Sequence, residues 1–152
     1  PPFPPVLFTD AYGLAKKMGL RRTVHVGEAD GPDKIWQAVE LLAPDRIGHG
    51  TSAGQDTALL RRLAEDGVMV ECCLTSNLQT GAVENLKDHP LPRFLEAGVK
   101  VALCTDNPTV SNTTLSAEYA LAMEQFALTE QDVRDLAAMS RRGTFLAGRA
   151  RG

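Results

Sequence analysis

The sequence predicts an α/β fold in which short parallel strands alternate with helices. Short apolar runs of β-type residues recur four times, and stretches with apolar residues at helical spacing separate them. The chain has 152 residues, of which 43% are hydrophobic, which is enough to bury one core. We therefore expect residues 1–152 to form a single domain, with a Pro-rich N-terminal segment at residues 1–9.

The first half of the chain carries clear start and stop signals. Thr9 or Asp10 can cap a first helix, which Gly19 ends. A strand follows at residues 23–26. Pro32 suits the first position of a second helix, whose apolar residues recur at helical spacing as far as Leu42.

The second half keeps the same rhythm. Gly67 ends a third helix, Gly98 ends a fourth, and Thr129 can cap the last one, which we expect to include Phe145. The remaining strands are expected at residues 46–48, 68–73 and 99–104. The remaining helices are expected around residues 59–66, 90–97, 115–126 and 129–145.

Strands separated by helices imply parallel pairing through right-handed crossovers. Both a doubly wound sheet and a piece of a (β/α)8 barrel fit this order. A complete barrel needs roughly 250 residues, so the chain supplies about half of one. The absence of an initiator Met indicates a fragment, a processed product or a trimmed chain.

Composition excludes several classes of partner. The net charge is −3 and both signs are mixed along the chain, which argues against a nucleic-acid or membrane-surface partner. No apolar run approaches the roughly 18 residues that span a bilayer, and the start lacks signal-peptide features. Cys72, Cys73 and Cys104 fit reduced strand cysteines rather than a disulfide framework, so we expect a cytoplasmic protein.

Polar residues follow each predicted strand. They are His25, Gly27 and Glu28, then His49, then Thr75, Ser76 and Asn77, then Asp106 and Asn107. Singly, each has a structural explanation as a core histidine, a helix cap or a surface carboxylate. Together they gather at the carboxyl edge of a parallel sheet, where active sites form, and they favour a metal and acid/base site. His89 lacks such neighbours and is expected to be exposed and inert.

Four segments resemble motifs of the adenosine deaminase family, in the same order and at similar intervals. They are T-V-H-V-G-E at 23–28, R-I-G-H-G at 46–50, S-N-L-Q-T-G at 76–81 and C-T-D-N-P at 104–108. The resemblance implies that the chain is the C-terminal half of a (β/α)8 TIM-type barrel, containing strands five to eight. The implied activity is zinc-dependent hydrolytic deamination of adenosine or 2'-deoxyadenosine to inosine and ammonia.

The resemblance also implies a role for each residue. His25 and Asp106 would bind the catalytic Zn2+, which lowers the pKa of a bound water toward about 7. His49 would orient that water, and Glu28 would protonate the purine ring nitrogen beside the attacked carbon. Asn107 would face the imidazole side of the purine.

Gly27 is expected to let the backbone approach the ligand closely. Many family members have Asp where this chain has Asn107. Purine N7 accepts hydrogen bonds, and an amide can donate to it at any pH, so Asn107 suits adenine-type rings without fixing the substrate.

One departure from the family concerns the metal. The family takes two further ligands from an H-x-H on its first strand, and no pair among His25, His49 and His89 has that spacing. Zinc usually takes three protein ligands plus water, so the isolated chain should bind it weakly or not at all. We expect the working enzyme to include an N-terminal half outside this sequence. The alternatives are an inactive truncated half-barrel, or a deaminase of adenine or another 6-aminopurine nucleoside.

Overall fold

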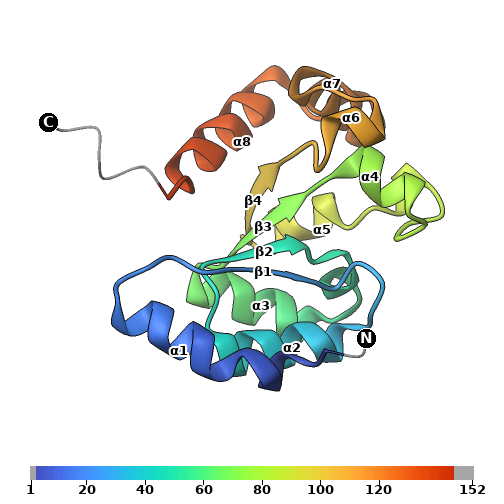
Figure 1. Ribbon diagram of the computed structural model, residues 1–152. Coiled ribbons are helices and arrows are strands. Elements are labelled where there is room, and N and C mark those ends of the chain that lie inside the picture. The colour runs from blue at the N-terminus through green and yellow to red at the C-terminus, as the bar shows by residue number, and fades with distance from the viewer. Residues whose placement is uncertain (1–2, 146–152) are drawn as a thin grey trace, which may run out of the picture.

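The computed structural model describes residues 3–145, in which four parallel strands form one sheet (Figure 1). The strands are β1 (Thr23–Val26), β2 (Arg46–His49), β3 (Met69–Cys72) and β4 (Lys100–Leu103). Their order in the sheet is β1-β2-β3-β4, so each strand pairs with the next one along the chain. Consecutive strands of a barrel are neighbours in this way, whereas the strand order of a doubly wound sheet reverses at a switch point. The predicted partial barrel is therefore confirmed.

Helices follow every strand, as the alternation predicts. The longer ones are α1 (Thr9–Lys17), α2 (Pro32–Leu42), α3 (Thr57–Asp66), α7 (Leu115–Phe126) and α8 (Glu130–Arg142). The shorter ones are α4 (Leu74–Gln79), α5 (Leu91–Glu96) and α6 (Pro108–Ser111), with 3-10 turns η1 (Pro5–Phe8), η2 (Thr51–Gln55) and η3 (Leu86–Asp88). In Figure 1, α1, α2 and α3 lie on one side of the sheet, and α8 lies beside β4.

Some local expectations differ from the structure. Helix α1 begins at Thr9 without a side-chain cap, and the Thr9 hydroxyl donates to the Val6 carbonyl of the preceding turn instead. The segment after β3 coils into α4. Helix α8 ends at Arg142, so Phe145 lies beyond it, and its ring covers the Arg46 guanidinium at 3.5 Å.

Strand alternation decides which side chains face the helices. Ile47, Val70 and Val101 are aligned across β2, β3 and β4, and all three are fully buried. Since successive residues of a strand point to opposite faces, the row that pairs His25 with Gly48 faces the other way. The apolar core thus fills one face and leaves His25 on the other, whereas His49 pairs with Val26 on the core-facing row at the end of β2.

The three cysteines are free, with Cys72 and Cys73 buried and Cys104 partly buried. Burial raises the pKa of the Cys73 thiol well above its usual range and that of Cys104 to about 11. These thiols are therefore uncharged and poorly reactive at neutral pH. Among residues 3–145, no helix is both long and apolar enough to cross a membrane.

Candidate active site

The site begins where β1 ends. His25 is the third residue of the strand, and its Nε2 lies 3.0 Å from Oε2 of Glu28. Gly27 turns the chain between them with a φ of 81°. A Cβ at this glycine would lie 2.4 Å from Cδ1 of Ile35 in the core, so packing as well as backbone conformation requires glycine here.

His49 and Asp106 share an unusual backbone conformation. Five described residues other than glycine have positive φ, and Ala43, Asn112 and Ala127 among them end helices. The other two are His49 at 64° and Asp106 at 55°, one at the end of β2 and one just after β4. Such conformations cost of order 1–3 kcal/mol each and cluster at functional sites, where the surrounding structure holds them.

Helix α4 links the predicted residues to one another. Ser76 donates through Oγ to Oδ2 of Asp106 at 2.8 Å, and Asn77 Nδ2 lies 2.9 Å from Nδ1 of His49. Thr80, just after the helix, donates through Oγ1 to Oε1 of Glu28 at 2.9 Å. Three side chains on α4 or directly after it therefore reach residues at the ends of β1, β2 and β4.

A buried carboxylate holds α4 in place. Glu118 of α7 is fully buried, and its carboxylate accepts hydrogen bonds from the Thr75 hydroxyl and from the Thr75 N–H at 3.3 Å. The Thr113 hydroxyl also donates to it, at 2.9 Å. Three donors satisfy a charge that would otherwise be costly to bury, so α4 is tied to α7 at its first turn.

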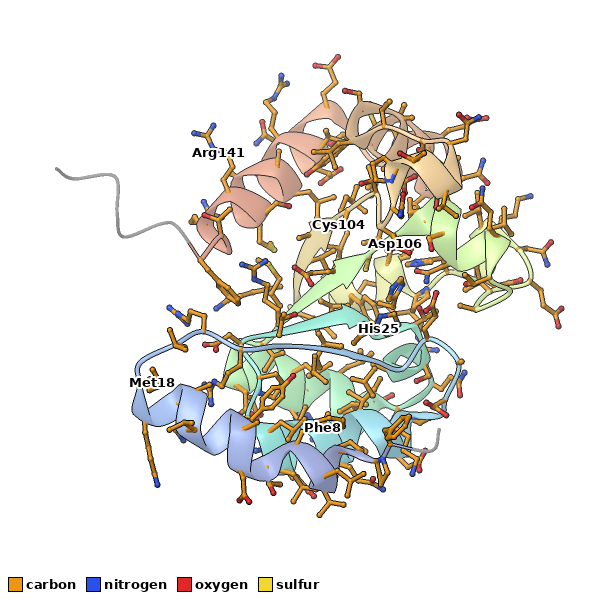
Figure 2. The ribbon with its side chains drawn as sticks, viewed as in Figure 1. Phe8, Met18, His25, Cys104, Asp106 and Arg141 are labelled. Carbon is orange, nitrogen blue, oxygen red and sulfur yellow. The ribbon has the colours of Figure 1, made fainter. Side chains whose placement is uncertain are left out.

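The predicted residues therefore gather in one place. The rings of His25 and His49 have centroids 4.4 Å apart, and Oε1 of Glu28 lies 3.5 Å from Nδ1 of His49. Figure 2 shows His25 and Asp106 on the same side of the sheet, where the strands end. The His25 side chain is 64% exposed, whereas His49 is only 4% exposed. Burial is the main influence on His49 and lowers its pKa, although Glu28 and Asp106 act in the opposite direction.

His89 contradicts its prediction as an exposed, inert residue. It is only 3% exposed, its Nδ1 accepts a hydrogen bond from the Leu91 N–H at 3.1 Å, and its Nε2 lies 3.2 Å from Oδ1 of Asn77. Pro90 draws the loop inward by packing on Gly54, where a Cβ would lie 2.4 Å from Pro90 Cβ.

Asn107 caps α6. Its Oδ1 accepts from the backbone N–H groups of Thr109 and Val110, both at 3.1 Å. Since Oδ1 is taken, the Nδ2 amide is the part of the side chain left to donate to a ligand.

Three described residues could share a metal ion. The ligand atoms of His25, Glu28 and His49 all lie within 4.8 Å of one another. Imidazole and carboxylate groups are suitable zinc ligands. Asp106 lies outside this compact group, so the predicted pair of His25 and Asp106 fits zinc only as part of a larger donor set.

A cavity of about 410 Å³ runs along β1 beside the site. His25, Gly27 and Glu28 line it together with Phe3 and Phe8. Its lining therefore combines residues of the polar site with apolar side chains from the segment before β1.

Comparison with known proteins shows similarity to adenosine deaminases and to related deaminases of known structure. A sequence profile described as adenosine deaminase matches residues 1–151. The adenosine deaminase of Serratia proteamaculans is 47% identical over 132 residues, which cover 87% of this chain and 40% of that protein. The adenosine deaminase of Yersinia enterocolitica is 45% identical with the same coverage. The chain thus spans about 40% of the length of these curated relatives.

Solved structures agree with the sequence relatives. An adenine deaminase from Arthrobacter aurescens aligns with a TM-score of 0.87 and 32% identity, over 93% of this chain and 43% of that one. An amidohydrolase from Burkhoderia ambifaria with bound zinc has a TM-score of 0.83 and 29% identity, over 93% and 40%. An Arabidopsis N6-mAMP deaminase has a TM-score of 0.82 and 32% identity, over 90% and 40%. By its sequence across residues 1–151, the chain belongs to the adenosine deaminase family.

Proposed function

We propose that this chain supplies half of the active site of a hydrolase that converts adenosine or 2'-deoxyadenosine to inosine and ammonia. The observation that carries the proposal is the convergence of His25, Glu28 and His49, which α4 ties to Asp106. Membership of the adenosine deaminase family supports the choice of a purine substrate.

His25 and Asp106 are proposed as two ligands of a catalytic Zn2+, with further ligands from protein outside this sequence. When bound, zinc lowers the pKa of a coordinated water toward about 7 and so supplies a nucleophile at neutral pH. The zinc-bound amidohydrolase of similar structure supports this choice of metal. In the described structure, Nε2 of His25 lies 3.0 Å from Oε2 of Glu28, so a zinc ion bound to Nε2 replaces this contact.

Glu28 is proposed as the acid that protonates the purine ring. Its Oε1 accepts hydrogen bonds from Thr80 at 2.9 Å and Asn77 at 3.4 Å, so an acid proton belongs on Oε2. Transfer of that proton to ring nitrogen N1 neutralises the charge that develops as the water oxygen bonds to C6. The C6–N bond then breaks, and the amino group takes the proton of the new C6 hydroxyl and leaves as ammonia while C6 becomes a carbonyl. The other proton of the attacking water restores the acid form of Glu28. Acid catalysis of this kind contributes typically about 10²–10⁴-fold.

Two further residues are proposed to orient the reactants. His49 faces the attacking water and holds it toward C6. Asn107 donates from Nδ2 to purine N7, since its Oδ1 is occupied by the start of α6. Gly27 stays a proposed substrate contact, although the close approach of Ile35 already accounts for the glycine.

The missing half of the barrel is proposed as the protein partner. Strands β1 and β4 lie at the two ends of the sheet order, so each has one side without a neighbour in the described part of the chain. In the segment that precedes β1, Phe3, Leu7 and Leu14 are exposed by 68%, 62% and 59%. This apolar surface and the adjoining cavity suit burial against the preceding strand of a closed barrel.

A related substrate is the second candidate. Solved relatives include an adenine deaminase and an N6-mAMP deaminase, and the cap at Asn107 serves any ring with an acceptor at N7. The polar groups described here recognise the base, so they do not distinguish adenine, a nucleoside and a nucleotide.

The decisive experiment completes the barrel. The N-terminal part of the Serratia proteamaculans relative is fused before Pro1, and ammonia release is followed with adenosine, 2'-deoxyadenosine, adenine and N6-methyl-AMP. We expect turnover of adenosine and a loss of at least about 100-fold in Glu28→Gln, because the acid proton is removed. Glu65→Gln, at an exposed carboxylate on α3, is the matched control. Full activity in Glu28→Gln, or zinc-loaded protein that is inactive on all four compounds, contradicts the proposal.

A further inference from the structure

The hydrogen bonds that connect His89 to His49 have a fixed direction. The chain starts at the backbone N–H of Leu91, which can only donate, and the acceptor is Nδ1 of His89 at 3.1 Å. Burial lowers the pKa of His89 to about 4, so the ring is neutral at physiological pH. A neutral imidazole whose Nδ1 accepts must carry its proton on Nε2.

The direction passes through the side-chain amide of Asn77. Nε2–H of His89 faces an Asn77 atom at 3.2 Å, which must be the acceptor Oδ1. The other end of the amide, Nδ2, then donates to Nδ1 of His49 at 2.9 Å and to Oε1 of Glu28 at 3.4 Å. With Nδ1 accepting, neutral His49 carries its proton on Nε2.

The opposite orientation of the amide conflicts at two points. It would bring the Nδ2 hydrogens of Asn77 against the Nε2–H of His89. It would also face Oδ1 toward Oε1 of Glu28, which leaves two acceptors in contact. Asn77 is fully buried, so water cannot relieve either conflict. One backbone N–H therefore sets the hydrogen positions on a series of three side chains.

The origin of this series is held rigidly. His89 packs on the ring of Phe126 of α7, with centroids 6.2 Å apart. Pro90 packs on Gly54 of η2, and Leu91 is fully buried at the start of α5. His89 is therefore held by its own contact with Phe126 and by the packing of the two residues that follow it.

We propose that His89 and Asn77 are positioning residues that lock His49 in the Nε2–H tautomer. The consequence for catalysis depends on the proposed function, in which His49 faces the attacking water. The tautomer itself does not depend on turnover. A ring held in one tautomer presents one defined donor, whereas a free imidazole exchanges between two.

The tautomer is measured by ¹⁵N NMR of the imidazole rings in the 152-residue chain, at neutral pH and without metal. The chain has three histidines, so single substitutions assign every resonance. We expect both His49 and His89 to show an unprotonated Nδ1 and a protonated Nε2. A protonated Nδ1 on His49 in the unsubstituted chain overturns the proposal.

Two substitutions at His89 form a matched pair. His89→Gln places an amide donor where Nε2 was and can still reach Oδ1 of Asn77, so His49 should stay in the Nε2–H form. His89→Asn reaches only as far as Nδ1, so the lock is lost and His49 should become a mixture of tautomers. An unchanged His49 in His89→Asn, or an equal effect of both changes, overturns the proposal.

Two further variants separate hydrogen bonding from packing. Asn77→Asp replaces the donor with an acceptor, so the His49 proton should move to Nδ1. Phe126→Leu loosens the packing around His89 but keeps the hydrogen bonds, so the tautomer of His49 should not change. A shift in Phe126→Leu as large as in His89→Asn means that packing sets the tautomer and overturns the proposal. Because ammonia release is not measured, failure of the proposed deaminase activity leaves these outcomes readable.

Discussion

Gly27 lies inside the motif that positions His25 and Glu28, and its replacement by alanine separates two reasons for a glycine there. The backbone φ of 81° costs an L-residue about 1–2 kcal/mol. The new Cβ also lies 2.4 Å from Cδ1 and 2.7 Å from Cγ1 of Ile35, which has no exposed surface. Overpacking of this kind adds about 1–3 kcal/mol, so Gly27→Ala should destabilise the chain by about 2–5 kcal/mol in total.

Gly81 provides the matched control. Its φ of 76° is nearly the same, but a Cβ there would meet nothing within 4 Å. Gly81→Ala should therefore cost only the backbone strain, about 1–2 kcal/mol. The free energy of unfolding is measured by urea denaturation of each 152-residue variant, and the difference between the two variants isolates the contact with Ile35.

A double-mutant cycle with Ile35→Ala tests the contact directly. Ile35→Ala alone should cost about 2–5 kcal/mol as a cavity in the core. The alanine methyl at Gly27 then enters that cavity, so the double variant should lose about 1–3 kcal/mol less than the sum of the singles. Equal effects of Gly27→Ala and Gly81→Ala, together with additivity in the cycle, would refute the packing explanation.

Three other predictions follow from single contacts. Burial holds the pKa of His89 at about 4 in the folded chain, so only the unfolded chain takes up this proton as pH falls below about 6.5. The free energy of unfolding, measured in urea titrations, should therefore drop by about 3 kcal/mol between about pH 7 and pH 4, and His89→Gln should lack this pH-dependent loss. Thr129 and Asp132 form a capping box at the start of α8, so Thr129→Ala should cost about 1 kcal/mol, whereas Thr129→Ser should keep most of the cap; equal losses would argue against the cap. Trp36 donates to Asp56 at 2.8 Å and lowers the pKa of that carboxyl, so Trp36→Phe should raise this pKa and reduce the loss of stability on acidification near pH 4. The pKa is followed by the carbon chemical shift of the Asp56 carboxyl, and an unchanged titration would contradict this.

Most of the fold could be predicted from the sequence because its signals are local. Pro32 and Gly67 mark where helices begin and end, and apolar runs mark the strands. The same runs are followed by His25, His49 and Asp106, so the parallel sheet predicts that they meet at one edge. Helix α4 was missed because residues 74–79 are too few for a periodic pattern, and long-range contacts with Glu118 hold it.

His89 could not be predicted from its neighbours in sequence. Its burial depends on the contact of Pro90 with Gly54, 36 positions earlier in the chain. It also depends on the contact of His89 with Phe126, 37 positions later. Asn77 was placed correctly at the strand ends, but its link between His89 and His49 requires β2, α4 and the loop before α5 to meet at one point. Hydrogen-bond networks of this kind are set by tertiary packing and leave little trace in a single sequence.

We propose that His25 and Asp106, 81 positions apart by their numbers, bind the same zinc ion. The most direct test of this proposal is the zinc content of the barrel completed with the N-terminal part of the Serratia relative, measured after dialysis against a weak chelator. We predict about one zinc per molecule in the unsubstituted protein and in Asn107→Ala, and loss of zinc in both His25→Ala and Asp106→Ala. Full zinc content in either of these last two variants would show that the substituted residue is not a zinc ligand.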